Sequence, residues 1–289
     1  GVWPSLPSNV ASAIGYWLAL ALLSIGWLRL LRACESATAP RFRSLLIYGG
    51  LVHGIALCAM PFLSDDSLFY AATSRLLTVF GGNPYQPYCR SLPAHDPFLT
   101  ILIDHWQCGT SAYFPGFHLV ARLVGAMSGE SLWLHLKLYQ AIAAICIFLS
   151  GLLVAAALRR GPQAPTYGFV AVVCNPLSII EGTANAHNDA LLALGCALFL
   201  WCFTRKSTLG ALASLAVSVT IKASALLLVA MYGTQLVMSM LTARARRLAD
   251  ALPWLMGFSL IVGVAALAIL RRHAPTLQFT AVLGSPSDP

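Results

Sequence analysis

Long apolar segments separated by short polar ones dominate the chain. Three uninterrupted runs, Val10 to Leu28, Leu45 to Leu63 and Leu138 to Leu158, are each close to the length of about 20 residues that crosses a lipid bilayer as a helix. A fourth run extends from Ala251 to Leu270. The first run is too long for the apolar part of a signal peptide and has no basic segment before it, so we interpret it as a membrane anchor.

The remaining apolar stretches are interrupted by polar residues. Tyr167 to Ile180 and Ala190 to Phe203 flank a polar link, and Leu209 to Leu241 contains Lys222 in its interior. A helix of 14 residues rises only about 21 Å, less than the ~30 Å of a hydrocarbon core, so these stretches predict short or broken helices. The pattern as a whole predicts an all-α, polytopic transmembrane helical bundle with roughly seven to nine spans, some of them broken.

Composition supports a membrane protein. The chain is 58% hydrophobic and 10% charged, whereas soluble domains carry about 25% charged residues. That leaves too few polar side chains to cover a water-facing surface. The net charge of +8 is spread along the chain without a long basic tract, which argues against a nucleic-acid partner. No internal symmetry of the kind expected for a transporter is evident.

Basic residues occur in four groups that the positive-inside rule assigns to the cytoplasm. This topology places the N-terminus and the loop of residues 64–112 outside, and it requires that Phe114 to Met127 does not cross the membrane. Arg271 and Arg272 then lie outside, against the rule. The four groups are Arg29, Arg32, Arg41 and Arg43; Arg159 and Arg160; Arg205 and Lys206; and Arg244, Arg246 and Arg247.

The extracytoplasmic loop of residues 64–112 is too long to be a simple connector. Apolar residues such as Leu68, Ala72 and Leu76 recur in it at helical spacing, which predicts short amphipathic helices on the outer membrane surface. Cys89 and Cys108 are the only cysteines in this loop. Because an extracytoplasmic compartment is oxidising, we expect them to form a disulfide, worth roughly 3 kcal/mol in the chain-entropy model.

Asp65 and Asp66 follow directly after the second apolar run. A carboxylate at this boundary is partly desolvated and could accept a proton from a sugar hydroxyl as a general base. Alternatively, the pair caps a helix from Ser67 to Phe80 by accepting hydrogen bonds from its free N–H groups. Both roles can coexist, one for each residue.

The polar link after Tyr167 to Ile180 is expected to lie below the outer surface, because the preceding helix is short. Irregular backbone at that depth is tolerated only in a protein-lined cavity, and an ordinary loop between slightly short helices is the alternative. His187 and Asp189 could bind a divalent metal with Asp65 or Asp66, although this spacing is a weak metal signal. We otherwise expect no cofactor. The link contains Asn175, Pro176, Glu181, Asn185, His187, Asn188 and Asp189.

Lys222 is an ionisable residue at apparent membrane depth. Such a residue is a candidate for function because burying an ammonium costs at least about 2.5 kcal/mol on insertion scales. The alternative is a lysine that extends to the surface from a helix end. If two short helices meet at Lys222, its ammonium lies on the same side as His187, where it could hold a phosphate.

Taken in order, several short motifs resemble those of the GT-C integral-membrane glycosyltransferases. The nearest branch is the polyprenol-phosphate-mannose-dependent α-mannosyltransferases of bacterial envelopes. Each motif is weak alone, but five in this order are moderately specific. The motifs are Ser64-Asp65-Asp66 with Tyr70 and Arg75, Gly82-Asn83-Pro84-Tyr85, Tyr113-Phe114-Pro115, Asn175-Pro176-Leu177 with Glu181, and His187-Asn188-Asp189, followed by Lys222.

The resemblance implies a single multi-pass domain over residues 1–289, with an incomplete C-terminus, in a bacterial inner (cytoplasmic) membrane. Its active side faces outward. The implied reaction moves a hexose such as mannose from a polyprenyl-phosphate donor to an envelope glycan or lipid acceptor. Membrane lipids and other membrane subunits are further expected partners, and nucleic acid is not.

The resemblance also implies residue roles. Asp65 or Asp66 is the expected catalytic base, and Arg75 contacts the donor phosphate or positions the loop. Two motifs lack prolines that family members usually have, after Tyr113 and after Lys222. A catalytically inactive, GT-C-derived scaffold subunit of a larger membrane complex is therefore the alternative function. The expected donor-binding residues are Arg75, Tyr113, Glu181, His187, Asn188, Asp189 and Lys222.

Overall fold

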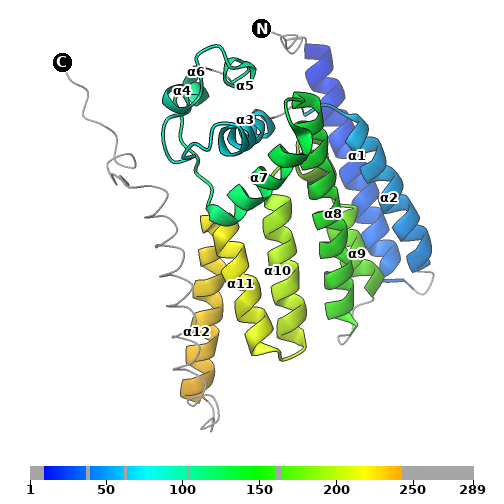
Figure 1. Cartoon of the computed structure of the whole chain (residues 1–289). Helices are drawn as coiled ribbons and strands as arrows, with labels where there is room; N and C mark the ends of the chain where they lie inside the picture. The colour runs from blue at the N-terminus through cyan, green and yellow to red at the C-terminus, as the bar shows by residue number, and fades with distance from the viewer. Residues whose placement is uncertain (1–9, 37–39, 62–63, 103, 160–164, 243–289) are drawn as a thin grey trace, which may run out of the picture.

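A computed structural model describes residues 10–36, 40–61, 64–102, 104–159 and 165–242. All regular structure in these ranges is helical, which confirms the all-α prediction for them. The helices form two groups (Figure 1): one set runs side by side, and a second set lies at one end of the first. The first set comprises α1 (Val10–Cys34), α2 (Phe42–Cys58), α8 (Leu132–Leu158), α9 (Pro165–Val173), α10 (Asp189–Thr204), α11 (Thr208–Ile221) and α12 (Leu226–Thr242). The second comprises α3 (Asp66–Thr78), α4 (Tyr88–Ser91), α5 (Pro97–Thr100), α6 (Asp104–Gln107) and α7 (Pro115–Ser128).

Two described helices are long and apolar enough to cross a membrane. They are Ile14–Cys34 within α1 and Leu132–Leu158, which is α8. A third span results if α9 and the π-helix η1 (Ser178–Ala184), which are bent by 56° at their junction, count as one. The predicted run from Ala251 to Leu270 lies outside the described residues. A total of seven to nine spans therefore stays a prediction.

The side-by-side helices place basic groups at one end. The α1–α2 connection, the end of α8 and the α10–α11 turn all lie opposite α3 to α7 in Figure 1. Arg32, Arg159 and Arg205 belong to these three places. This distribution agrees with the predicted topology, although the group at Arg244 lies outside the described residues and the side of the membrane stays a prediction.

Helix α3 differs from the expected surface helix. Its residues from Ser67 to Leu76 are all buried, because α5, α7 and α8 pack around it. The prediction of an amphipathic helix with a solvent-facing polar side is therefore wrong for α3, whereas its position relative to the membrane surface stays a prediction. Tyr70, Phe117 and Tyr139 form the centre of the resulting core, with Tyr70 and Phe117 rings 4.9 Å apart.

The loop after α3 is closed by the predicted disulfide. Cys89 and Cys108 are bonded, with their Cα atoms 4.9 Å apart. Next to it, the Tyr88 amide donates to the Gly109 carbonyl at 3.1 Å, so the two ends of the segment are also joined through the backbone. Helix α7 then crosses the end of the bundle obliquely (Figure 1), as required if Phe114 to Met127 does not span the membrane.

The break between α9 and η1 follows from Pro176, which has no backbone N–H to continue a helix. The Leu177 amide donates instead to Oδ1 of Asn175 at 3.0 Å. The carbonyl of Val173, left without its helical partner, accepts from Nε2 of His53 at 2.9 Å. Because Thr183 and Asn185 are fully buried, this part of the polar link is enclosed by protein, whereas Asp189 at its end is exposed.

The apolar run from Leu209 to Leu241 is also broken, at the predicted position. α11 ends at Ile221, and Lys222 has extended backbone (φ −148°, ψ 137°) before the short 3-10 helix η2 (Ala223–Ala225) and α12. Lys222 is therefore at a junction of two helices. This confirms the two-helix interpretation of that run for the described residues.

Candidate functional site

Four charged or titratable side chains from distant parts of the chain meet at the end of the bundle that carries α3. The Asp66 carboxylate lies 3.4 Å from Nδ1 of His187, and the Asp189 carboxylate lies 3.7 Å from the same nitrogen. Lys222 Nζ donates to both carboxylate oxygens of Asp189, at 2.7 and 2.9 Å. With Glu181, described below, these residues form what we call the polar cluster.

The structure separates the roles of the two neighbouring aspartates. Asp65 is exposed, and its side chain makes no capping hydrogen bond; its backbone carbonyl accepts from the amides of Leu68 and Phe69 instead. The capping role predicted for the carboxylate of Asp65 is therefore wrong. Asp66, in the first turn of α3, is half-buried, and its carboxylate accepts from the Tyr70 hydroxyl at 3.4 Å. Only Asp66 is placed in the polar cluster.

His187 is surrounded by carboxylates. Besides Asp66 and Asp189, Glu181 of η1 lies 3.8 Å from its Nε2. The preceding residue, Ala186, has a positive φ of 58°, which is strained for a residue other than glycine. The His187 amide donates to the Glu181 carbonyl at 3.1 Å, so the π-helix and this turn together hold the imidazole between its acidic neighbours.

Two tyrosines border the polar cluster. The hydroxyls of Tyr70 and Tyr113 lie 3.3 Å apart. Burial raises the pKa of Tyr113 to about 12, with the nearby charge of Asp66 contributing in the same direction. Burial likewise raises the pKa of Tyr70. Both phenols therefore stay protonated at neutral pH and can donate hydrogen bonds to an anion.

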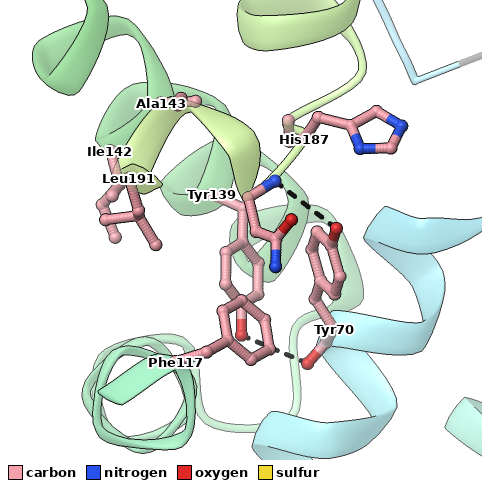
Figure 2. Close-up of a pocket in the computed structure, with 10 residues that line it drawn as sticks. Tyr70, Phe117, Tyr139, Ile142, Ala143, His187 and Leu191 are labelled. Atoms are coloured by element: carbon pink, nitrogen blue, oxygen red, sulfur yellow. Dashed lines mark hydrogen bonds between the residues drawn. The ribbon is translucent and has the colours of Figure 1, made fainter. Parts of the chain in front are cut away.

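The side chain of Asn188 does not belong to the polar cluster. Its backbone amide donates to the Tyr70 hydroxyl at 3.4 Å, but its buried side-chain Nδ2 and Oδ1 have no hydrogen-bond partner among the described residues. It lines a cavity of about 10 Å³, about the space that one water molecule needs. Figure 2 shows this cavity, with the His187 ring pointing away from Phe117 and Tyr139. The side chain of Asn188 is thus turned toward the core.

Arg75 is not brought to the polar cluster. It follows Asp66 by nine positions on α3, a rise of about 14 Å. Its Nε donates to the buried Asp96 carboxylate at 2.6 Å, and its guanidinium stacks on Phe98 at 4.9 Å. Asp96 in turn accepts from the Phe98 amide at 2.9 Å and so begins α5. Of the two roles expected for Arg75, these contacts support positioning of the loop.

A divalent metal finds no ready site in the described part of the chain. No group of three His, Cys, Asp or Glu side chains there has metal-binding geometry. His187 and the carboxylates around it are 3.4 to 3.8 Å apart, at the spacing of ion-pair partners rather than of metal ligands. The suggested metal therefore gains no support from these residues.

Sequence reasoning missed three side chains that hold the site in place. Lys137 Nζ donates to the carbonyls of Leu57 and Ala59, at 2.7 and 2.8 Å, at the end of α2. Gln140 donates to the carbonyls of Ala59 and Ala184, and so ties α2 to η1. His53 bonds the hydroxyl of Thr183 at 2.7 Å through Nδ1. Isolated polar residues in otherwise apolar runs were the available signal, since burying such groups unpaired is costly.

Comparisons with known proteins bear on this geometry. The family described as "Alpha-(1->6)-mannopyranosyltransferase, N-terminal domain" matches residues 1–239. The chain belongs to this family. Over 168 residues it is 21% identical to Alpha-(1->6)-mannopyranosyltransferase A of Corynebacterium glutamicum, a match that covers 58% of this chain and 34% of that relative. The chain therefore spans about a third of the length of that relative. No solved structure matches the chain.

Family membership confirms the resemblance to membrane α-mannosyltransferases. The match ends at residue 239, close to the end of the described residues, and includes the whole polar cluster. The apolar helices described above agree with a membrane-associated glycosyltransferase.

Proposed function

We propose that this protein transfers mannose from a polyprenyl-phosphate donor to a hydroxyl of an envelope glycan or lipid, at the outer face of the bacterial inner membrane. The observation that carries the proposal is the meeting of Asp66 of α3, His187 and Asp189 at the start of α10, and Lys222 after α11. An acid, an imidazole and an ammonium within one cluster supply a proton acceptor and a cation for a phosphate. The family supplies the sugar.

Asp66 is the proposed general base. Its carboxylate takes the proton from the acceptor hydroxyl as the oxygen attacks the anomeric carbon of mannose. The bond from that carbon to the phosphate oxygen breaks, and the polyprenyl phosphate leaves with the bonding electron pair. A single displacement of this kind inverts the configuration at the anomeric carbon. Asp65 is exposed and lacks contact with the cluster, so we assign it no catalytic role.

Lys222 is the proposed contact for the donor phosphate. Its side chain is about one-third exposed, at the junction of α11 and η2, and so is accessible to a ligand at the end of the bundle. Tyr113 is close enough to Asp66 and Tyr70 to donate a hydrogen bond into the same region. We assign Glu181 to the positioning of His187.

The experiment that tests this proposal compares Asp66→Asn with Asp65→Asn in the full-length protein. Asparagine keeps the shape of the side chain but cannot accept the proton, so Asp66→Asn should lower kcat by about 100-fold to 10,000-fold with little change in donor affinity. Asp65→Asn should retain activity. The assay is transfer from polyprenyl-phosphate mannose in nanodiscs.

Two results contradict the proposal. If wild-type protein transfers sugar from no polyprenyl-phosphate donor, the inactive scaffold becomes the better interpretation. If Asp66→Asn is as active as wild type, the base lies elsewhere. The matched Asp65→Asn variant carries the same charge change one residue away, so it separates proton transfer from the loss of negative charge.

A further inference from the structure

The charges of the polar cluster raise a question about anion binding. Three carboxylates, those of Asp66, Glu181 and Asp189, lie around His187, whereas Lys222 is the one ammonium among the described residues that contacts any of them. With a neutral imidazole the cluster carries two net negative charges. A phosphate approaching it would meet repulsion rather than attraction unless the ammonium is free to face it.

Lys222 is not free in this structure. Its Nζ contacts both oxygens of Asp189, at 2.7 and 2.9 Å, in the manner in which an ammonium would contact two oxygens of a phosphate. The two residues are partly open to solvent, with side chains 32% and 53% exposed, so this ion pair is weak enough to be exchanged. Asp189 also has a second neighbour, because its carboxylate lies 3.7 Å from Nδ1 of His187.

We propose that the Asp189 carboxylate occupies the phosphate site at Lys222 in the free protein and leaves it when a phosphate ligand binds. The phosphate takes the two oxygen positions on Lys222, and Asp189 turns to His187. This inference rests on the proposed function, because that function is what brings a phosphate to Lys222. Asp189 thereby sets the affinity for the donor by competing with it.

The exchange predicts that a substitution in the binding site raises the affinity for the ligand, whereas such substitutions usually lower it. Asp189→Asn removes the competing anion and one repulsive charge, so the affinity for a polyprenyl phosphate should rise by about twofold to tenfold. If Asp189 instead holds Lys222 in its working position, the same variant should bind more weakly. Glu181→Gln is the matched control, because it removes one charge from the cluster without touching Lys222.

The test uses full-length protein in phosphatidylcholine nanodiscs and a fluorescent polyprenyl phosphate without sugar. Parallel measurements with phosphatidylglycerol in the nanodisc and with inorganic phosphate as competitor show whether a lipid headgroup or free phosphate takes the same site. The expected order of affinity is Asp189→Asn above wild type, with Lys222→Met below it. A structure with the probe bound should place Asp189 beyond 4 Å from Lys222 Nζ.

Each other outcome overturns a defined part of the argument. Weaker or unchanged binding by Asp189→Asn, or an equal rise in Glu181→Gln, contradicts the exchange while leaving the donor class intact. Full affinity in Lys222→Met contradicts the phosphate contact itself. Failure of wild type and Asp189→Asn alike to bind the polyprenyl phosphate contradicts both the exchange and the proposed donor.

Discussion

The Asp66 carboxylate lies 3.4 Å from Nδ1 of His187, although the two residues come from the first turn of α3 and from the link between η1 and α10. Their approach depends on two breaks in the helical pattern, one before α3 and one after α9. The loop and the broken helix are therefore parts of one site.

The first prediction concerns the pH dependence of stability through His118 of α7. Burial lowers the pKa of His118 from 6.5 to about 4 in the folded protein, where its Nε2 lies 2.9 Å from the Ser111 hydroxyl. Below pH 6.5 the unfolded chain binds a proton that the folded chain does not. Stability should therefore fall as the pH decreases from 6.5 to 4, by up to about 3 kcal/mol, and stay unaffected by this group above pH 6.5.

Thermal melting in detergent at pH 7 and pH 4.5 measures this effect. His118→Gln cannot bind a proton in this range, so its melting temperature should fall less between the two pH values than that of wild type. Equal pH dependence in both proteins would show that other groups are responsible.

A second prediction separates the two roles that the sequence left open for Arg75. The Arg75–Asp96 pair is buried, with the residues 9% and 5% exposed, so Arg75→Met leaves an unpaired carboxylate in the core. Stability should fall by about 3–5 kcal/mol. Arg75→Met combined with Asp96→Asn should recover part of the loss, since the buried charge is gone. The measurement is chemical unfolding, monitored by the fluorescence of the loop of residues 64–112.

The Arg75→Met variant also tests whether Arg75 contacts the donor phosphate. If Arg75 contacts phosphate, the folded fraction of Arg75→Met should bind polyprenyl phosphate more weakly than wild type. We expect unchanged affinity, because Arg75 lies about 14 Å along α3 from Asp66.

The sequence predicted those features that depend on local pattern. Prolines and polar residues within apolar runs located the breaks at Pro176 and Lys222, because each interrupts backbone or side-chain burial within one helix. The pairing of Cys89 with Cys108 followed from their being the only cysteines in one loop. The residues of the polar cluster could also be named in advance, because they are polar residues within or next to apolar runs.

Contacts between helices were not predictable in this way. The sequence cannot show that His53 of α2 meets Val173 and Thr183, since hydrophobic periodicity does not specify which helices are neighbours. The sequence likewise predicted a surface helix for α3. Its polar side is buried by α5, α7 and α8, and local pattern does not show that these helices pack against it. Ser74 and Tyr139, whose hydroxyls lie 2.7 Å apart, illustrate such a partnership.

A third prediction addresses topology. Single cysteines replace His95, beside α5, and Lys206, in the α10–α11 turn, in a background without the six unpaired cysteines. Both positions are exposed, and α5 and the α10–α11 turn lie at opposite ends of the bundle in Figure 1. The positive-inside rule predicts that an impermeant thiol reagent labels the cysteine at 95 in intact cells and the one at 206 only after lysis. The reverse pattern would put the polar cluster in the cytoplasm.

A fourth prediction concerns the disulfide. Cys89→Ser with Cys108→Ser opens a loop of 18 intervening residues and should lower the free energy of unfolding of this region by about 3 kcal/mol. Asp66 of the polar cluster lies in the helix before this loop, and Tyr113, which borders the cluster, lies in the segment after it. Transfer activity should therefore be lost at a lower temperature in the double variant than in wild type. Limited proteolysis near residue 95 measures the opening. Equal protection with and without the disulfide would contradict the prediction.

The last prediction tests whether the contact between α7 and α11 positions the two sides of the site. Gly116 lies against Thr220, and a Cβ at residue 116 would stand 2.7 Å from the Thr220 backbone oxygen, closer than atoms can approach. The neighbouring Phe114 amide donates to the Ile221 carbonyl at 3.4 Å, next to Lys222. Gly116→Ala should therefore push the start of α7 away from this junction and cost about 1–3 kcal/mol of stability.

The same displacement should raise KM for the donor more than it lowers kcat, because it moves Tyr113 and Lys222 apart while leaving Asp66 beside His187. Gly26→Ala in α1 is the matched control. Apart from its chain neighbours and the backbone of its own helix, no atom of the described residues lies within 4 Å of the added methyl group, and alanine favours a helix. Stability and KM should therefore stay within error of wild type or improve slightly. A Gly116→Ala protein that melts and binds donor as wild type does would show that the α7–α11 contact can relax without cost, and that Tyr113 and Lys222 are positioned independently.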